Sequence, residues 1–125
     1  MTGETHDNHR THIQTAQDFL DKSDLYFAEG DELQGSEKTW GAAAHAVMAV
    51  AQQRGWPYGD HRSLKIAVRR LADELDDPFL ETAFGIAEKF HANFYHKFMQ
   101  DYEFDRDRPA IRLFVQRLQS ILHSE

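Results

Sequence analysis

Residues able to bind ligands or transfer protons gather in three short segments of the sequence. In the first, Glu37 and Lys38 precede Trp40, and His45 stands eight residues after Glu37, near the same face of a helix. The second is His61, at the expected start of a helix, where the N-terminus favours a neutral imidazole or a bound anion. Lys38 and His61 can therefore meet an anion, while Trp40 or Tyr95 can stack on a ring.

The third segment is crowded with polar side chains among phenylalanines. It holds His91, Asn93, Tyr95 and His96, and His91 and Tyr95 are four residues apart, close enough on a helix to act together. We expect the three segments to form one polar pocket for an anionic or nucleotide-like ligand. The alternative is that these groups only satisfy one another inside the protein. The predicted ligand-binding residues are Glu37, Lys38, Trp40, His45, His61, His91, Asn93 and Tyr95.

Established catalytic motifs are missing from the sequence. It contains no Walker loop, no Gly-x-Gly-x-x-Gly, no Gly-x-Ser-x-Gly and no His-Glu-x-x-His. A di-metal carboxylate bundle needs two Glu-x-x-His copies, and only Glu88 with His91 fits that spacing. The histidines at positions 6, 9 and 12 lack a carboxylate frame, so metal binding there would be adventitious. We expect no cofactor and no resident metal ion.

Composition bounds the class of protein. The chain has 125 residues, 41% of them hydrophobic, which suits one compact domain with a real core. The absence of cysteine excludes disulfides and thiolate chemistry and is compatible with a reducing cytoplasm. No apolar run is long enough for a bilayer, and the N-terminus does not read as a secretion signal. We therefore expect a cytoplasmic location without membrane insertion.

The net charge of −7 argues against a protein that coats phosphate backbones. The acidity belongs to the first half, because residues 1–60 carry 10 acids and 4 bases, against 11 and 10 in residues 61–125. Arg62, Lys65 and Arg69 fall on one helical face in a stretch without acids. They form either a small anion-binding strip or a solvated face paired with acids elsewhere.

Apolar spacing predicts helices throughout. One helix runs from Thr11 toward a stop at Gly30-Asp31, and another from Leu33 to the break at residues 55–59. Asp60 caps the third, and Asp77 caps the fourth, whose phenylalanine stripe predicts the centre of the core. A turn over 105–109 precedes a short last helix, 110–122. We predict an all-α, up-and-down bundle of four long helices plus a shorter C-terminal one, with residues 1–11 a flexible tail and 12–125 the domain.

Three ordered segments carry a family resemblance. They are GDELQGSEKTWGAAAHAVMAVAQQRGW from Gly30, DHRSL from Asp60, and AEKFHANFYHKF from Ala87. They resemble the PaREP family of small helical proteins, with its Gly-Asp, then Glu-Lys-x-Trp-Gly-Ala-Ala-x-x-Ala-Val, then His, then Leu/Phe-His-x-Asn-Phe-Tyr in the same order. The likeness runs from about Ala16 to Leu122.

That family in turn resembles the helical bundles that include HEPN domains and the substrate-binding domains of nucleotidyltransferases. The resemblance implies an up-and-down bundle, a homodimer, and a link with nucleotides or RNA. The expected partner protein is a nucleotidyltransferase or another protein. HEPN ribonucleases carry an Arg, a polar residue and then a His a few positions on. Arg54 with His61, and Arg117 with His123, both depart from that spacing.

The sequence therefore predicts a non-catalytic helical binding module for a nucleotide, an RNA end or a partner protein, acting as a homodimer in the cytoplasm. One alternative is a metal-independent ribonuclease using Arg54 and His61. Another is a purely structural oligomerisation protein, since the small residues 41–44 could form a self-association face.

Overall fold

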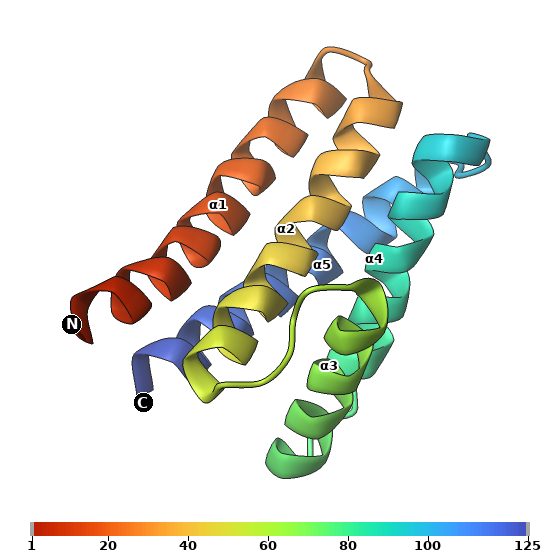
Figure 1. The fold of residues 1–125 in the computed structure, drawn as a ribbon. Coiled ribbons are helices and arrows are strands. Elements are labelled where there is room, and N and C mark those ends of the chain that lie inside the picture. The colour runs from red at the N-terminus through yellow and green to blue at the C-terminus, as the bar shows by residue number, and fades with distance from the viewer. Residues whose placement is uncertain (1, 125) are drawn as a thin grey trace.

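The computed structural model describes the backbone of residues 2–124 and the side chains of residues 11–124. Five helices follow one another: α1 (Thr2–Ala28), α2 (Glu32–Arg54), α3 (His61–Leu75), α4 (Phe79–His96) and α5 (Asp101–Ser124). Within residues 2–124 there is no strand, so the predicted all-α bundle is confirmed. Figure 1 shows α1 and α2 side by side as an antiparallel hairpin.

The first helix starts earlier than the apolar pattern indicates. α1 begins at Thr2, so its backbone takes in most of the segment expected as a separate tail. The side chains of His6 and His9 lie outside the described residues. The flexibility of residues 1–11 and the domain boundary after them stay predictions.

α2 lies at the centre of the bundle and contacts each of the other four helices. The expectation that the phenylalanine-rich α4 holds this place is wrong, because small side chains allow closer packing than large ones. A Cβ atom at Gly41 would lie 2.6 Å from Cδ2 of Phe19, so α1 sits directly against the α2 backbone. Ala42 and Ala43 are fully buried. The small-residue face at positions 41–44 is thus used for packing within the chain.

Side-chain caps explain where two of the helices begin. Asp60 accepts a hydrogen bond from the Ser63 backbone N–H at 2.7 Å, which confirms the predicted cap of α3. The predicted capping role of Asp77 is wrong. Pro78 is the N-cap of α4, without a side-chain hydrogen bond, and the Asp77 carboxylate accepts hydrogen bonds from Arg117 at 2.8 and 3.0 Å instead. Asp77 therefore ties the start of α4 to α5.

The predicted turn at 105–109 is also wrong, because α5 continues through it with Pro109 inside the helix. An internal proline costs a helix about 3 kcal/mol, but buried Phe104, Ile111 and Phe114 continue the core face on both sides of it. α5 consequently has 24 residues and is not the short helix; that is α3, with 15.

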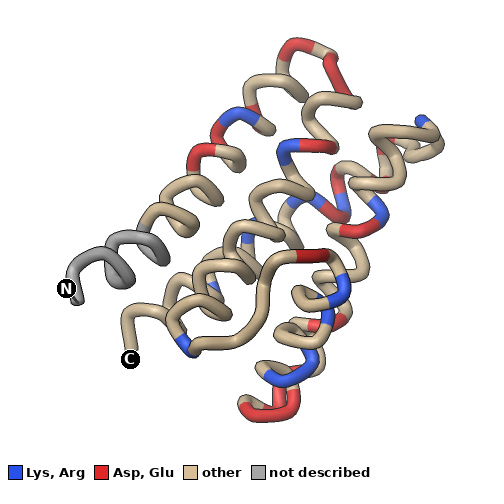
Figure 2. Tube along the Cα trace, viewed as in Figure 1, with Lys and Arg blue, Asp and Glu red and all other residues tan. Residues whose placement is uncertain are grey.

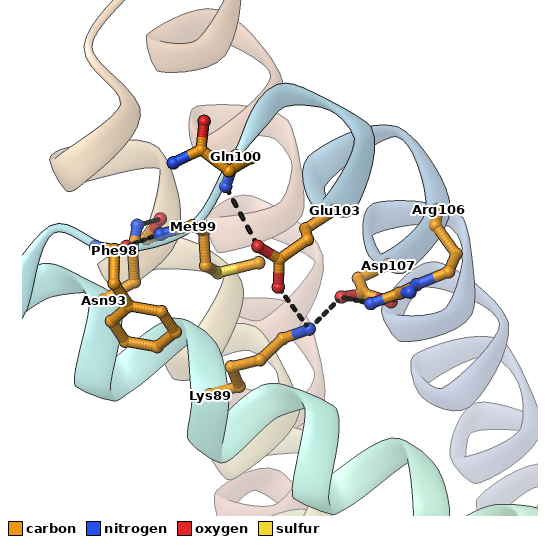
Figure 3. A network of polar contacts seen from close by, with 9 residues as sticks. Lys89, Asn93, Phe98, Met99, Gln100, Glu103, Arg106 and Asp107 are labelled. Atoms are coloured by element: carbon orange, nitrogen blue, oxygen red, sulfur yellow. Dashed lines mark hydrogen bonds and ion pairs between the residues drawn. The ribbon is translucent and has the colours of Figure 1, made fainter.

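A polar network joins α4 to α5 near their connecting loop (Figure 3). Lys89 Nζ donates hydrogen bonds to Glu103 and to Asp107, and Arg106 Nε donates to Asp107 at 2.8 Å. The Asp107 side chain is only 3% exposed. Burial alone would raise the pKa of Asp107, but the hydrogen bonds from Arg106 and Lys89 outweigh it and hold that pKa below its ordinary value. The carboxylate is therefore charged and paired in the folded protein.

Candidate functional site

Trp40 brings two histidines from different helices together. The ring centroids of His61 on α3 and His91 on α4 each lie 5.0 Å from the centroid of the Trp40 indole on α2, with interplanar angles of 41° and 29°. Buried Phe84 supports the group from α4, at 5.5 Å from the same indole. Three helices thus meet in one aromatic contact, at the start of α3 where the α2–α3 loop joins it (Figure 1).

Each of the two histidines is paired with its own carboxylate. His61 Nε2 lies 2.7 Å from Glu88 Oε2, and His91 Nδ1 lies 3.2 Å from Glu37 Oε2. An ionised carboxylate only accepts hydrogen bonds, so both of these ring nitrogens carry a proton. The opposite nitrogens, Nδ1 of His61 and Nε2 of His91, are the ones that can meet a ligand. We call Glu37, Trp40, His61, Glu88 and His91 the histidine cluster.

The histidine cluster is open to solvent. The His61 side chain is 45% exposed, and the side chains of Glu37, Glu88 and His91 are each about a third exposed. Lys65 lies next to the histidine cluster, with its Nζ 3.5 Å from Glu88 Oε2. Tyr95 contacts His91 edge-on at 5.4 Å and is 67% exposed. The arrangement is a surface patch carrying two polarised imidazoles, one ammonium group and an accessible aromatic ring.

Five of the eight predicted ligand-binding residues therefore lie together, and three do not. The five are Glu37, Trp40, His61, His91 and Tyr95. Lys38 points to the opposite side of α2, where its Nζ lies 4.7 Å from the ring centroid of Phe19 on α1. Neighbours in sequence lie about 100° apart around a helix, so Lys38 could not share the face of both Glu37 and Trp40.

His45 belongs to a separate contact between α1 and α2. Its Nδ1 lies 3.1 Å from Nδ1 of His12, and Phe19 packs against it edge-on at 5.5 Å. One of the two nitrogens must donate and the other accept, so the bond exists only while at least one ring is neutral. Burial lowers the pKa of both histidines below 6.5, and for His45 the charge of His12 adds to the effect.

We predict that this histidine pair weakens the fold in mild acid. Because the folded-state pKa values lie below 6.5, the unfolded chain takes up protons first, and stability falls as the pH drops through and below that value. Urea unfolding of the protein and of His45→Gln between pH 7.5 and 5.5 measures the effect. The variant should lose less stability over this range; a loss equal to that of the parent protein would contradict the prediction.

Asn93 is a buried structural residue. Its Nδ2 donates to Ser36 Oγ at 3.0 Å, and its Oδ1 accepts from the backbone N–H groups of Phe98 and Met99, both at 2.8 Å. Figure 3 shows it turned toward the α4–α5 loop. Its Oδ1 holds that loop and its Nδ2 bonds to α2, and Asn93 is only 2% exposed, so the structure gives it a structural role in place of the predicted ligand-binding one.

The catalytic candidates Arg54 and His61 do not meet within the chain. Arg54 pairs with Glu74, and its guanidinium lies 5.2 Å from the ring centroid of Trp56. Glu74 stands near the C-terminal end of α3, whereas His61 is the first residue of that helix. At the usual rise per residue the two ends are about 20 Å apart along the axis.

Sequence reasoning missed the role of Glu88. It stands three residues before His91 and suggests a metal motif, but it pairs with His61 from α3 while His91 pairs with Glu37 from α2. Within the part of the chain whose side chains are described, no three His, Asp or Glu side chains converge as metal ligands. The expected basic strip on α3 is largely paired: Lys65 with Glu88, and Arg69 with Asp73 and Glu81. Figure 2 shows Lys and Arg recurring along α3 and acidic residues at both its ends.

Among the described residues, no helix is long and apolar enough to cross a membrane. No curated protein sequence matches the chain. A crystal structure of a protein from Sulfolobus solfataricus is similar in fold, with a TM-score of 0.77 over 86% of this chain and 96% of that one, at 17% sequence identity. The sequence also matches the archaeal PaREP1/PaREP8 family over residues 11–115, which is most of its length. The chain therefore belongs to the archaeal PaREP1/PaREP8 family.

Proposed function

We propose that the protein is a binding module whose histidine cluster holds the phosphate of a nucleotide or of an RNA end. The observation that carries this proposal is the pair of imidazole–carboxylate contacts on either side of one indole, in a solvent-open patch. Each carboxylate orients a ring, and a protonated imidazole is a strong donor to phosphate oxygens.

The charge of the patch depends on how many protons the two imidazoles carry. With both imidazoles neutral, Glu37, Glu88 and Lys65 leave the patch one charge negative. With both protonated, the same groups are one charge positive. A bound phosphate is therefore best balanced by the form in which both imidazoles carry a second proton.

Tyr95 is the better stacking surface for a base. The Trp40 indole already contacts two histidines and Phe84, while the Tyr95 ring is mostly exposed beside His91. A nucleobase on Tyr95 would lie next to a phosphate held by His91, and aromatic stacking contributes about 1–3 kcal/mol per base. Of the two predicted stacking residues, Trp40 and Tyr95, we therefore propose Tyr95.

Titration with AMP and with a 5′-phosphorylated RNA oligonucleotide, followed by backbone amide NMR shifts, tests the proposal. We expect the double variant His61→Ala/His91→Ala to bind at least about tenfold more weakly, since two charge-assisted hydrogen bonds are lost. The double variant His96→Ala/His123→Ala removes two exposed histidines elsewhere and should bind as the parent does. Adenosine or 5′-hydroxyl RNA binding as tightly as the phosphorylated probe would reject phosphate recognition.

A second candidate is metal-independent RNA cleavage at the same place. Each of His61 and His91 is partly exposed and has one ring nitrogen oriented by a carboxylate, which is how a general base or a general acid is positioned. Labelled RNA incubated with the protein in EDTA tests it. Cleavage that persists unchanged in His61→Ala would rule out this candidate. In this proposal the pair His61 and His91 replaces the earlier catalytic pair Arg54 and His61, which do not meet within one chain.

We also propose that the module acts in the cytoplasm as a homodimer, with a nucleotidyltransferase as partner, as the helical bundles it resembles suggest. A dimer needs a surface other than residues 41–44, which pack inside the chain. Sedimentation velocity at micromolar concentration measures the oligomeric state, and a monomer there would reject the dimer.

A further inference from the structure

A second candidate site lies on the other side of α2 from the histidine cluster. Residues of α1, α2 and α5 line a partly open cavity of about 290 Å³, a volume close to the lower end of the range for small-molecule sites. Its polar lining comes from Ser23 and Asp24 on α1, Thr39 on α2, and Asp105, Arg108 and Arg112 on α5. None of these residues belongs to the histidine cluster, so this cavity stands apart from the proposed phosphate site.

The rim of the cavity carries equal positive and negative charge. Arg108 and Arg112 each donate a hydrogen bond to a separate oxygen of the Asp24 carboxylate, at 2.9 and 2.6 Å. A guanidinium has five N–H donors, so these bonds leave others for a ligand. With Asp105, the lining holds two guanidinium groups and two carboxylates. A ligand of net charge zero that carries both signs matches it best.

The interior of the cavity offers hydrogen-bond acceptors. Thr39 Oγ1 donates to the Gly35 carbonyl at 2.8 Å, so in the 2.8 Å contact between Ser23 and Thr39 the Ser23 hydroxyl is the donor. The lone pairs of Ser23 remain as acceptors. Pro109 has no N–H, which leaves the carbonyl of Asp105 without its usual helical donor. A ligand with several N–H donors can satisfy these groups.

We infer that this cavity binds a small zwitterion of the amino-acid type with an apolar side chain. The ligand carboxylate accepts from Arg108 and Arg112, and the ligand ammonium donates to Asp24 and Ser23. Leu20 and Phe104 supply the apolar wall for the side chain. A simple anion fits less well, because the Asp24 carboxylate beside the two arginines repels a second negative charge that no ammonium group offsets.

Three probes that differ only in charge test the inference. L-leucine carries both charges, 3-methylbutylamine lacks the carboxylate, and 4-methylpentanoate lacks the ammonium group. Titrated at millimolar concentration and followed by amide NMR shifts, leucine should shift the resonances of Ser23, Thr39 and Phe104. The two singly charged probes should bind about tenfold more weakly. No shift with leucine, or equal binding of 4-methylpentanoate, would overturn the zwitterion assignment.

Asp24→Asn distinguishes a zwitterion site from an anion site, because the two sites predict opposite changes in ligand affinity. For a zwitterion the variant loses the ammonium partner and leucine binding weakens about tenfold, whereas an anion site gains affinity when the competing carboxylate is gone. Asp21→Asn is the matched control, since it removes one exposed α1 carboxylate outside the cavity lining. Arg112→Gln, a second change in the lining, should also weaken leucine; unchanged affinity in both lining variants would refute the site.

Discussion

Asn93→Ala is expected to lower the free energy of unfolding by about 3–4 kcal/mol, more than any other polar substitution in the core. The change removes three hydrogen bonds at once. The backbone N–H groups of Phe98 and Met99 and the hydroxyl of Ser36 lose their partner, and water has little access because Asn93 and Met99 are buried. Urea unfolding followed by circular dichroism measures the loss.

Ser36→Ala is the matched control for Asn93. It removes a single hydrogen bond from the same buried cluster. The two hydrogen bonds from the α4–α5 loop to Asn93 Oδ1, which we call the clamp, stay in place, so we expect the free energy of unfolding to fall by about 1–2 kcal/mol. If both variants lost the same stability, the two backbone hydrogen bonds to Asn93 Oδ1 would contribute nothing measurable, and the clamp would be refuted.

Lys89→Met is expected to cost about 2–3 kcal/mol at neutral pH. The substitution keeps an unbranched apolar stem but removes the ammonium group, and leaves the buried Asp107 carboxylate with Arg106 as its remaining cationic partner among those in Figure 3. Removing one partner of a buried ion pair is costly because the other charge stays desolvated. Lys22→Met, which removes an exposed lysine on α1, should change the stability by less than about 0.5 kcal/mol.

Acid should shrink the difference between Lys89→Met and the parent protein. The folded-state pKa of Asp107 lies below its ordinary value of 3.8, so the stability from its ionised form is present above that pH. This stability is lost as the pH falls through the lower folded-state pKa of Asp107, where the carboxylate takes up a proton and has no charge left to pair with Lys89. Thermal unfolding from pH 7 to 3 follows this; a constant difference would show that Lys89 acts through packing alone.

Local sequence signals determined much of this protein. Apolar spacing along each segment, the Asp60 cap and the breaks at Gly30 and Gly55 were enough to predict an all-helical bundle, because helix periodicity and caps depend on residues within a few positions. The same local logic failed at Pro109, where burial of residues on both sides kept α5 intact. It also failed at Asp77, whose partner Arg117 is far away in sequence.

Only the tertiary structure decided which polar residues share a site. The sequence named Glu37, His61 and His91 as candidates, but it could not say that His61 would pair with Glu88, or that Lys38 and His45 would turn toward α1. Those outcomes depend on how α2 is rotated against its neighbouring helices. Gly41, for example, lets Phe19 of α1 pack directly on the α2 backbone. Contacts between residues that are distant in the chain produce no recognisable pattern in the sequence, because they form only when whole helix faces pack together.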